Sequence, residues 1–575
     1  MHLNDSLGRE ARIRYICNHH EQACAMAAEA YARVTGKVGV INVTSGPGGI
    51  NSLSGVFGAW TDSIPMLVIS GQVKRETCMA TSGRRDLRQL GDQEVDIVRM
   101  VQGITKYAVL IEDPLTIRYH LERAYYLARS GRPGPCWLDI PVDVQSAMLD
   151  EASLDGYNPE EDQPKWNLEK VREQCREILQ RSQSSPRPVI MAGSGVRLAN
   201  AVELFQTVVR KLRVPVTTAW TGHDLFPSDD PLYCGRPGTV GDRPGNFTVQ
   251  NADLLLVIGC RLHIRQISYN WKSFARAAYK IQVDVDAAEF NKPTVRPDMA
   301  VHCDAKLFLE ELNRQLDDSR YDPTCHAQWL AWCRERVRRY PVLQPKHCVK
   351  GAILDPYYFV HALFQCIAAD DVVVCGDGAA CVIPFQVGQI RNGQRMFANA
   401  GCAAMGYDLP AAIGAAIARD GKRVICLAGD GSIQLNIQEL QTVAHQALPI
   451  KIFVLNNGGY LSIRSTQQSF FGRLVGESPA SGLSFPDMVQ VGKAYGLPAV
   501  RLASLDFETT LDNVLRAPGP VLCEVLLDPA RPFEPRVSSR VLPDGRIVSS
   551  PLEDLYPFLE SEELLSNLLI PRYES

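Results

Sequence analysis

Short apolar runs recur along this chain, and glycine or polar residues end most of them. Residues 423–428 (RVICLA) form one such run, which predicts a buried strand because it is short, hydrophobic and stopped by glycine. Between residues 433 and 444, apolar residues recur at helical spacing. A second apolar run follows at residues 451–456 (KIFVLN). Strand, helix and strand in this order predict two strands of one parallel sheet.

The same alternation of strands and helices fills most of the chain. Runs of strand length include KVGVINVT, MLVISG, DLLLVIG, KIQVDVD and DDVVVCGDG. The predicted fold class is therefore α/β, with three doubly wound parallel-sheet domains covered on both faces. These domains are predicted at residues 1–150, 168–340 and 355–530.

Three segments lack this alternation. Residues 149–167 are acidic and proline-bearing and predict a surface linker, and a second linker is predicted near residues 340–356. The tail, residues 531–575, is too polar to form a domain. We expect it to be an arm that lies over the other domains.

The beginning of the chain departs from the pattern. Residues 2–10 predict a helix and residues 12–17 (RIRYIC) predict a strand. A doubly wound sheet normally opens with a strand and a glycine-containing loop. We therefore expect a first domain that is truncated at its N-terminus and lacks one inner strand, because of a misassigned start codon or a trimmed sequence.

Composition argues against several classes of protein. With 575 residues, 46% hydrophobic and 22% charged, the chain has the composition of an ordinary soluble protein of several domains. The net charge of −4 gives no support for nucleic acid or an anionic membrane as a partner. No apolar run approaches the roughly 18 residues that span a bilayer. The seventeen cysteines include no C-x-x-C pair, which predicts reduced thiols in a cytoplasmic protein rather than disulfides or a zinc site.

The candidate chemistry lies where the two strands at residues 423–428 and 451–456 end. Asp430 follows the first strand, and Asn457 follows the second 27 positions later. The carboxyl ends of parallel strands share the edge where such sheets bind ligands. Asp430, Asn457 and the carbonyl of Gly459 offer three oxygens, which together with phosphate oxygens suit Mg²⁺. The alternative is a GDG turn and an unrelated NN turn in an ordinary α/β protein.

Five motifs in one order carry a family resemblance. They are HHEQ with the alanine-rich helix after it, TSGPGG, RPGPCWLDIPVDVQ, AAMGYDLPAAIG, and GDGSIQLNIQEL with LNN downstream. The chain resembles the catalytic subunits of acetolactate synthases and related thiamine diphosphate enzymes. The resemblance covers nearly the whole chain. It implies a pyrimidine-binding domain, a central domain of the FAD-binding type and a diphosphate-binding domain, in that order.

The resemblance implies a role for each candidate residue at the cofactor. Glu21 would hydrogen-bond the aminopyrimidine ring and act in general acid–base catalysis, with a solvated glutamate at a helix start as the alternative. Met405 would be the apolar wedge that bends the cofactor, unless it only packs in the core. The carbonyl of Ala403 would accept a hydrogen bond from the cofactor's amino group. Asp430, Asn457 and Gly459 would hold Mg²⁺, while Gly378, Gly429, Gly431 and Ser432 would bind the cofactor, the last two facing its diphosphate at a helix N-terminus.

Further expectations follow from the same resemblance. Gln93 would lie beside the reacting centre, or else be an exposed residue of a charged loop. Arg261 and residues 284–286 fall near the family's flavin-binding positions, so FAD is a candidate third cofactor, although several relatives keep this domain and lose the flavin. Glu21 and the cation motif lie in different domains. The family's site between two subunits therefore implies a homodimer or homotetramer.

The implied activity is that of a transferase, which joins a two-carbon unit from pyruvate to a second carbonyl compound. The alternatives within enzymes are a 2-oxo acid oxidase that uses thiamine diphosphate and FAD, and a decarboxylase. A non-catalytic relative is a third alternative. The joint presence of Glu21, Asp430 and Asn457 argues against it.

The chain departs from acetolactate synthases around the acceptor. Thr466 stands where those enzymes carry a tryptophan, Val142 replaces a lysine, and Asp92 replaces an aromatic residue. These changes favour a larger, hydroxylated or charged acceptor, as in enzymes that add a two-carbon branch to nucleotide-linked keto sugars. A second 2-oxo acid stays the alternative acceptor.

Three arginines are candidates for contacts with these substrates. Arg464 would pair with the donor carboxylate or with an acceptor phosphate, or else be solvated. In the tail, Arg536 and Arg540 would close over a nucleotide, with a solvated arm as the alternative.

Overall fold

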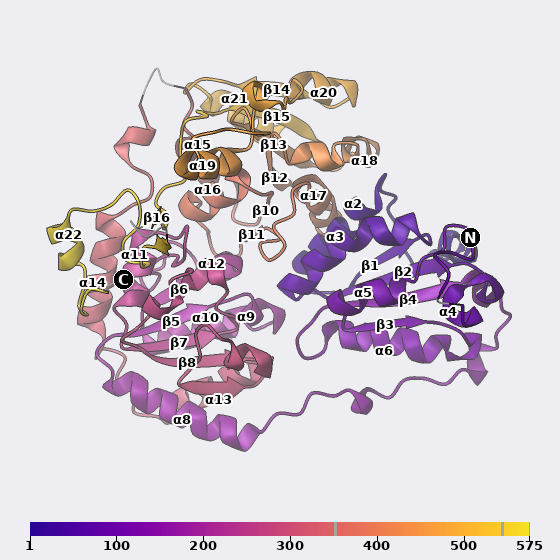
Figure 1. Ribbon diagram of the computed structural model, residues 1–575. Coiled ribbons are helices and arrows are strands. Elements are labelled where there is room, and N and C mark those ends of the chain that lie inside the picture. The colour runs from indigo at the N-terminus through magenta and orange to yellow at the C-terminus, as the bar shows by residue number, and fades with distance from the viewer. Residues whose placement is uncertain (85, 350–352, 542–545, 574–575) are drawn as a thin grey trace.

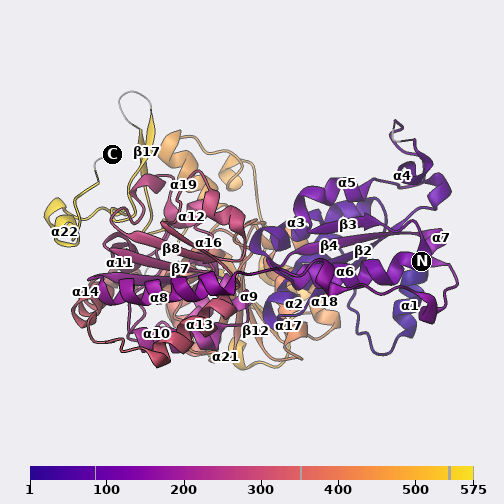
Figure 2. The same ribbon diagram turned by 90° about the horizontal axis from the view of Figure 1, so that it is seen from below.

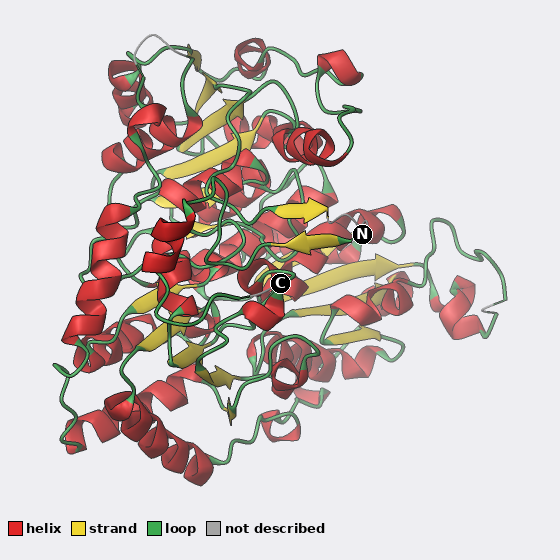
Figure 3. Cartoon of the chain, turned by 60° about the vertical axis from the view of Figure 1, so that its left-hand side comes forward, coloured by secondary structure: helices red, strands yellow, loops and turns green. Residues whose placement is uncertain are grey.

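The computed structural model describes the whole chain except residues 85, 350–352, 542–545 and 574–575. The described residues form three α/β units, each built on a sheet of parallel strands with helices on both faces (Figures 1 and 3). The prediction of an α/β fold with three parallel-sheet domains is therefore confirmed. Because helices cover both faces, the inner strands are buried along their whole length, as their unbroken apolar runs predict.

The first unit carries a four-stranded parallel sheet in the order β1-β2-β4-β3. Its strands are β1 (Gly39–Val43), β2 (Met66–Gln72), β3 (Tyr107–Leu110) and β4 (Pro135–Pro141). Its helices are α1 (His2–Arg9), α2 (Glu21–Thr35), α3 (Pro47–Asp62), α4 (Met79–Ser82), α5 (Ile97–Val101), α6 (Ile117–Arg129) and α7 (Val142–Gln145). The glycine-rich turn after β1 opens α3, so this turn lies at the carboxyl edge of the sheet.

The prediction of a strand at residues 12–17 is wrong. The helix before it is present as α1, but residues 12–17 pair with no strand of the described sheets. Ile13 and Tyr15 gave the segment an alternating apolar pattern, yet they are 49% and 59% exposed. A strand needs a neighbour for its backbone hydrogen bonds, and this segment instead leads through an extended stretch into α2.

The central unit carries five parallel strands in the order β6-β5-β7-β8-β9. The strands are β5 (Pro188–Ala192), β6 (Val216–Thr218), β7 (Leu254–Ile258), β8 (Tyr279–Asp284) and β9 (Met299–His302). The helices are α8 (Leu168–Ser184), α9 (Gly195–Leu198), α10 (Val202–Leu212), α11 (Arg243–Gln250), α12 (Ile264–Ile267), α13 (Ala305–Asp318) and α14 (Ala327–Arg339). The strand order reverses between β5 and β7, which is where such sheets bind ligands.

The third unit carries six parallel strands in the order β11-β10-β12-β13-β15-β14. The strands are β10 (Val372–Cys375), β11 (Arg395–Phe397), β12 (Val424–Gly429), β13 (Ile450–Asn456), β14 (Ala499–Leu502) and β15 (Val521–Leu526). The helices are α15 (Pro356–Cys366), α16 (Ala379–Val387), α17 (Asp408–Ala418), α18 (Glu439–His445), α19 (Leu461–Phe470), α20 (Met488–Ala494) and α21 (Glu508–Arg516). Successive residues of the inner strands belong to two apolar clusters on opposite faces of the sheet.

The connecting segments lie on the surface. An extended stretch runs from the first unit to α8 of the central unit (Figures 1 and 2). The tail forms a hairpin of β16 (Ser539–Val541) and β17 (Ile547–Ser549), followed by α22 (Ser561–Ser566). Glu553 of the tail accepts hydrogen bonds from Gln250 (2.5 Å) and Arg276 (2.8 Å), which dock it on the central unit. None of the described helices is both long and apolar enough to span a bilayer.

The first and third units meet where α2 crosses α17 (Figures 1 and 2). The crossing is close because Gly414 has no side chain: a Cβ there would lie 1.9 Å from the carbonyl oxygen of Ala27. Buried polar contacts reinforce it. Arg33 pairs with Glu29 (2.5 Å), and Tyr407 donates to the same carboxylate at 2.6 Å. The two units therefore form one packed body within the chain.

We expect Gly414→Ala to destabilise the protein. The added methyl group meets backbone rather than a movable side chain, so α2 and α17 must separate, at a cost of roughly 1–3 kcal/mol in the free energy of unfolding. Equilibrium denaturation would measure the change. Gly103→Ala is the matched control, because a Cβ at Gly103 would meet nothing within 4 Å. An equal effect of the two substitutions would contradict the explanation.

Candidate functional site

The two predicted strand ends meet at one edge of the third sheet. Strand β12 pairs in parallel with β13, and Gly429, the last residue of β12, lies opposite Leu455. Asp430 and Asn457 follow these strands directly, so the pairing brings them to neighbouring turns. Both side chains are buried.

The oxygens at this edge fit a divalent cation. Asp430 accepts backbone hydrogen bonds from Gly431 (2.8 Å) and Gly459 (3.0 Å), which orient its carboxylate. Burial raises the pKa of Asp430 to about 6, so a cation beside it would favour the ionised form. The Oδ1 atom of Asn457 is buried without a hydrogen-bond partner among the described residues. A buried oxygen without a partner is costly, and a hard cation would satisfy it.

Arg464 fixes the turn that carries Asn457 and Gly459. Its guanidinium donates to the carbonyls of Asn457 (3.4 Å) and Gly458 (3.1 Å), and its Nε donates to Glu477 at 2.6 Å. Burial alone would raise the pKa of Glu477, but hydrogen bonds from Ser478 and Arg464 outweigh it and lower this pKa. The alternative of a solvated Arg464 is therefore wrong, while its contact with a substrate anion stays a prediction. Its side chain is 13% exposed.

The turn around Met405 packs against the segment that follows Asp430. Ala403 has a φ of +55°, a strained value for a residue with a side chain. The backbone N–H of Gly406 donates to Ser432 Oγ at 2.9 Å, and the amide of Asn436 donates to the Gly406 carbonyl at 2.8 Å. These bonds bring the predicted wedge residue and the predicted cation motif together.

Two glycines at this edge have different effects: Gly431 leaves room for the ring of Tyr460, and Gly378 leaves open space. A Cβ on Gly431 would lie 2.0 Å from Cε1 of Tyr460. Gly378 precedes α16 with a φ of +63°, and a Cβ there would meet only Ser462 at 3.9 Å. The helix predicted after Ser432 is divided, because a 3₁₀ turn at Ile433–Asn436 comes before α18.

Glu21 and Gln93 lie at the carboxyl edge of the first sheet. Glu21 begins α2, and its Oε2 accepts a hydrogen bond from Asn51 at 3.1 Å. Gln93 is exposed, has a φ of +59°, and places its carbonyl oxygen 2.1 Å from where a Cβ of Gly46 would lie. Both residues therefore border the same glycine turn. Among the described residues, no hydrogen bond joins Glu21 to the cation edge.

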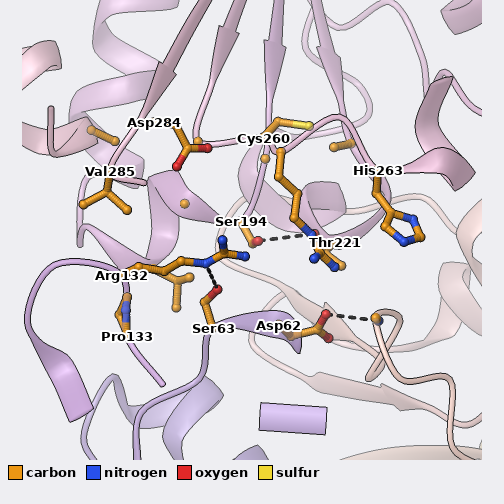
Figure 4. Close-up of a pocket in the computed structure, with 18 of the residues that line it drawn as sticks. Asp62, Ser63, Arg132, Pro133, Ser194, Thr221, Cys260, His263, Asp284 and Val285 are labelled. Carbon is orange, nitrogen blue, oxygen red and sulfur yellow. Dashed lines mark hydrogen bonds between the residues drawn. The ribbon is translucent and has the colours of Figure 1, made fainter. Parts of the chain in front are cut away.

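A separate pocket opens at the carboxyl ends of β5 and β7 in the central unit (Figure 4). Arg261 and Asp284 line it, as do residues of the first unit that face it from the opposite side. Arg132 of the first unit donates to Ser63 (2.9 Å) and pairs with Asp286 (2.8 Å) across it. Of the flavin positions predicted from sequence, Arg261, Asp284 and Val285 therefore line one pocket, whereas Asp286 is paired with Arg132.

The residues that depart from acetolactate synthases lie near the surface. Thr466 and Asp92 are exposed, and Thr466 Oγ1 donates to the Ser462 carbonyl of its own helix at 2.9 Å. Val142 is partly buried at the start of α7. In the tail, Arg536 lies over the ring of Tyr556, and Arg540 is in β16.

The sequence analysis missed three polar residues that organise the site: Asn436, Glu439 and Glu477. All three are at most 1% exposed and form hydrogen bonds to the segments that carry candidate residues. Asn436 and Glu439 stand beside apolar residues at helical spacing. A polar residue beside such a face is a usable signal, because a buried polar group requires a partner.

Comparisons with known proteins agree with the three units. Family descriptions of the thiamine pyrophosphate enzymes match residues 1–100 (N-terminal TPP binding domain), 175–312 (central domain) and 376–525 (C-terminal TPP binding domain). The acetolactate synthase large subunit of Cyanidium caldarium is 32% identical over 90% of this chain and 86% of its own length. The chloroplastic acetolactate synthase 2 of Zea mays is 33% identical over 92% and 81%, respectively. The chloroplastic acetolactate synthase 1 of Nicotiana tabacum is 31% identical over 92% and 78%.

The contacts of Arg464 generate a prediction for Glu477→Gln. Loss of the carboxylate charge releases Arg464 and loosens the turn of Asn457 and Gly459, so Mg²⁺ affinity should fall by roughly 10- to 100-fold. Calorimetric titration with Mg²⁺ at saturating thiamine diphosphate would measure it. Thr466→Val, an exposed change on the neighbouring helix, is the control. Equal Mg²⁺ affinities in the two variants would show that the turn does not depend on this ion pair.

Proposed function

The chain belongs to the acetolactate synthase family of thiamine diphosphate enzymes, and we propose that it joins a two-carbon unit from pyruvate to a second carbonyl compound. One observation carries the proposal: the buried oxygens of Asp430 and Asn457 lie at the same sheet edge as the turn of Met405. Hydrogen bonds of Gly406 with Ser432 and Asn436 hold this turn at that edge. This edge offers what a phosphorylated, metal-bound cofactor requires. The relatives named above are acetolactate synthases.

Each candidate site residue has a defined role in this proposal. Asp430, Asn457 and the Gly459 carbonyl would hold Mg²⁺, whose charge would offset that of a diphosphate. Met405 would support the cofactor through apolar contact, and the carbonyl of Ala403 would accept a hydrogen bond from its amino group. When bound, thiamine diphosphate supplies the carbon nucleophile that adds to the pyruvate carbonyl and carries the two-carbon unit after CO₂ leaves.

Glu21 moves the proton that prepares the cofactor. Its Oε2 receives one hydrogen bond, from Asn51, and its Oε1 lies beside the glycine turn, 3.6 Å from the position of a Cβ on Gly48. A carboxyl group in this position can exchange a proton with a ring nitrogen that comes against the turn. Gln93, which borders the same turn, would lie beside the reacting carbonyl in this proposal.

We propose that the complete site forms between two copies of the chain. Glu21 hydrogen-bonds within its own unit, and no hydrogen bond joins it to Asp430 or Asn457 among the described residues. The residues on either side of it are held against the third unit of the same chain. A partner subunit would supply the cation edge that faces Glu21, in a homodimer or a homotetramer of such dimers.

The acceptor has two candidates. The exposed hydroxyl-bearing side of α19, with Ser462 and Thr466, supports a larger hydroxylated acceptor such as a nucleotide-linked keto sugar. The names of the relatives support a second 2-oxo acid. In both cases the reaction forms a carbon–carbon bond and releases CO₂.

The pocket of the central unit supports FAD as a second organic cofactor. It lies at the reversal of strand order, where dinucleotides bind to sheets of this kind. Arg261 lines it and takes part in none of the ion pairs among the described residues, so its guanidinium is available for a diphosphate.

We propose that the protein acts in a reducing compartment. All seventeen cysteines are free, which supports a reducing compartment such as the cytoplasm. The plant relatives carry names that assign them to chloroplasts.

Product analysis tests the proposed activity. With thiamine diphosphate, Mg²⁺ and pyruvate, we expect mass spectrometry to detect a carbon–carbon addition product with 2-oxo acids or 4-keto-deoxysugar nucleotides. Glu21→Gln should lower kcat by roughly 10²- to 10⁴-fold, because the proton transfer is lost. Acetaldehyde alone, or acetate with peroxide, would contradict the carboligation.

A mixed dimer provides the control for Glu21→Gln. One chain carries Asp430→Asn and its partner carries Glu21→Gln, so one shared site has both defects and the other has neither. We expect about half of the wild-type activity, whereas each variant alone is nearly inactive. An inactive mixed dimer would contradict the site between subunits.

Absorption spectroscopy tests the flavin. We expect the purified protein to contain FAD, and Arg261→Ala should weaken FAD binding on the order of tenfold through loss of a charge-assisted hydrogen bond. Fluorescence titration of flavin-free protein would measure the affinity. Arg320→Ala, an exposed arginine outside the pocket, should leave it unchanged.

A further inference from the structure

The segment before Glu21 is bound to a carboxylate of the third unit. Glu439, the first residue of α18, accepts the backbone N–H groups of His19 (2.9 Å) and His20 (3.1 Å) with its Oε1. Its Oε2 accepts the side-chain amide of Asn18 at 3.0 Å. Glu439 is 0% exposed and takes part in none of the ion pairs among the described residues. Most of the hydrogen bonds that its carboxylate accepts therefore come from the three residues that precede Glu21.

The residue after Glu21 is bound by the same part of the third unit. Asn436 donates its side-chain amide to Gln22 Oε1 at 3.1 Å and to the carbonyl of Gly406 at 2.8 Å. Asn436 is also 0% exposed. The views in Figures 1 and 2 agree that α2 begins beside α18 and α17. Both flanks of Glu21 are therefore fixed by residues that lie just after the cation motif of the same chain.

We propose that Glu439 is a positioning residue that places the Glu21 carboxylate of its own chain, and thereby serves the active site in which the partner supplies the cation edge. This inference rests on the proposed function. The backbone N–H groups of His19 and His20 explain how Glu439 can set the position of Glu21. Two N–H groups held by one oxygen define where the chain enters α2, and Glu21 is the first residue of that helix.

A purely local role for Glu439 predicts a different result. Glu439 also accepts a hydrogen bond from Thr442 at 2.7 Å, and it begins the helix that follows the cation motif. If it only stabilised that helix, its loss would impair the cation edge of its own chain. The two roles therefore concern different active sites of one dimer, which makes them separable.

Mixed dimers separate the two roles. The reference dimer combines an Asp430→Asn chain with a Glu21→Gln chain, so its single intact site takes Glu21 from the first chain and the cation ligands from the second. Glu439→Gln is then added to either chain. We expect kcat to fall on the order of tenfold when Glu439→Gln is on the Asp430→Asn chain, because a displaced catalytic group loses rate steeply. On the Glu21→Gln chain it should leave kcat unchanged.

The opposite pattern, or an equal loss from both placements, would overturn the proposal. An inactive reference dimer would instead refute the shared site of the proposed function. In that case amide hydrogen exchange in the Glu439→Gln homo-oligomer still decides the inference. The amides of His19 and His20 should exchange at least about tenfold faster, while those of β12 stay protected. Unchanged protection at His19 and His20 would overturn it.

Discussion

Parallel pairing of β12 with β13 is the constraint on which the site depends. It puts Asp430 and Asn457, 27 positions apart in sequence, on adjacent turns of one buried sheet edge. Both strands are buried along nearly their whole length, so a shift in their register would disturb the packing on both faces of the sheet. The relative position of the two oxygens is therefore set by the hydrophobic core rather than by the turns themselves.

The turns are then fixed by buried polar groups that come from elsewhere. Arg464, which is held by Glu477, donates to the carbonyls of Asn457 and Gly458, and Asn436 donates to the turn of Met405. These groups lie inside the protein, where each lost hydrogen bond leaves an unsatisfied partner. Among the described residues, the Asn457 Oδ1 atom has no hydrogen-bond partner, so it is available for a cation.

Close packing and buried polar contacts also join the first and third units. Gly414 permits α2 to approach α17, and Glu29 and Arg33 form a buried polar cluster with Tyr407 at that contact. Close packing of small residues gives the two units a fixed orientation, and the buried Glu29 would lose its hydrogen bond from Tyr407 if the contact opened. Segments far apart in sequence, such as the one before Glu21 and the one after Asp430, therefore move together.

By itself, the sequence determined the fold class and the main inner strands, and it predicted Asp430 and Asn457 at neighbouring strand ends, because apolar runs and glycine turns are local signals that the core preserves. It misassigned residues 12–17, whose alternating pattern finds no neighbouring strand. It also left Arg464 among substrate contacts. Only the tertiary structure showed that Arg464 pairs with Glu477 and that Glu439 accepts hydrogen bonds from the segment before Glu21. The partner of a buried polar side chain depends on which distant segments the fold brings together, and the sequence does not show this.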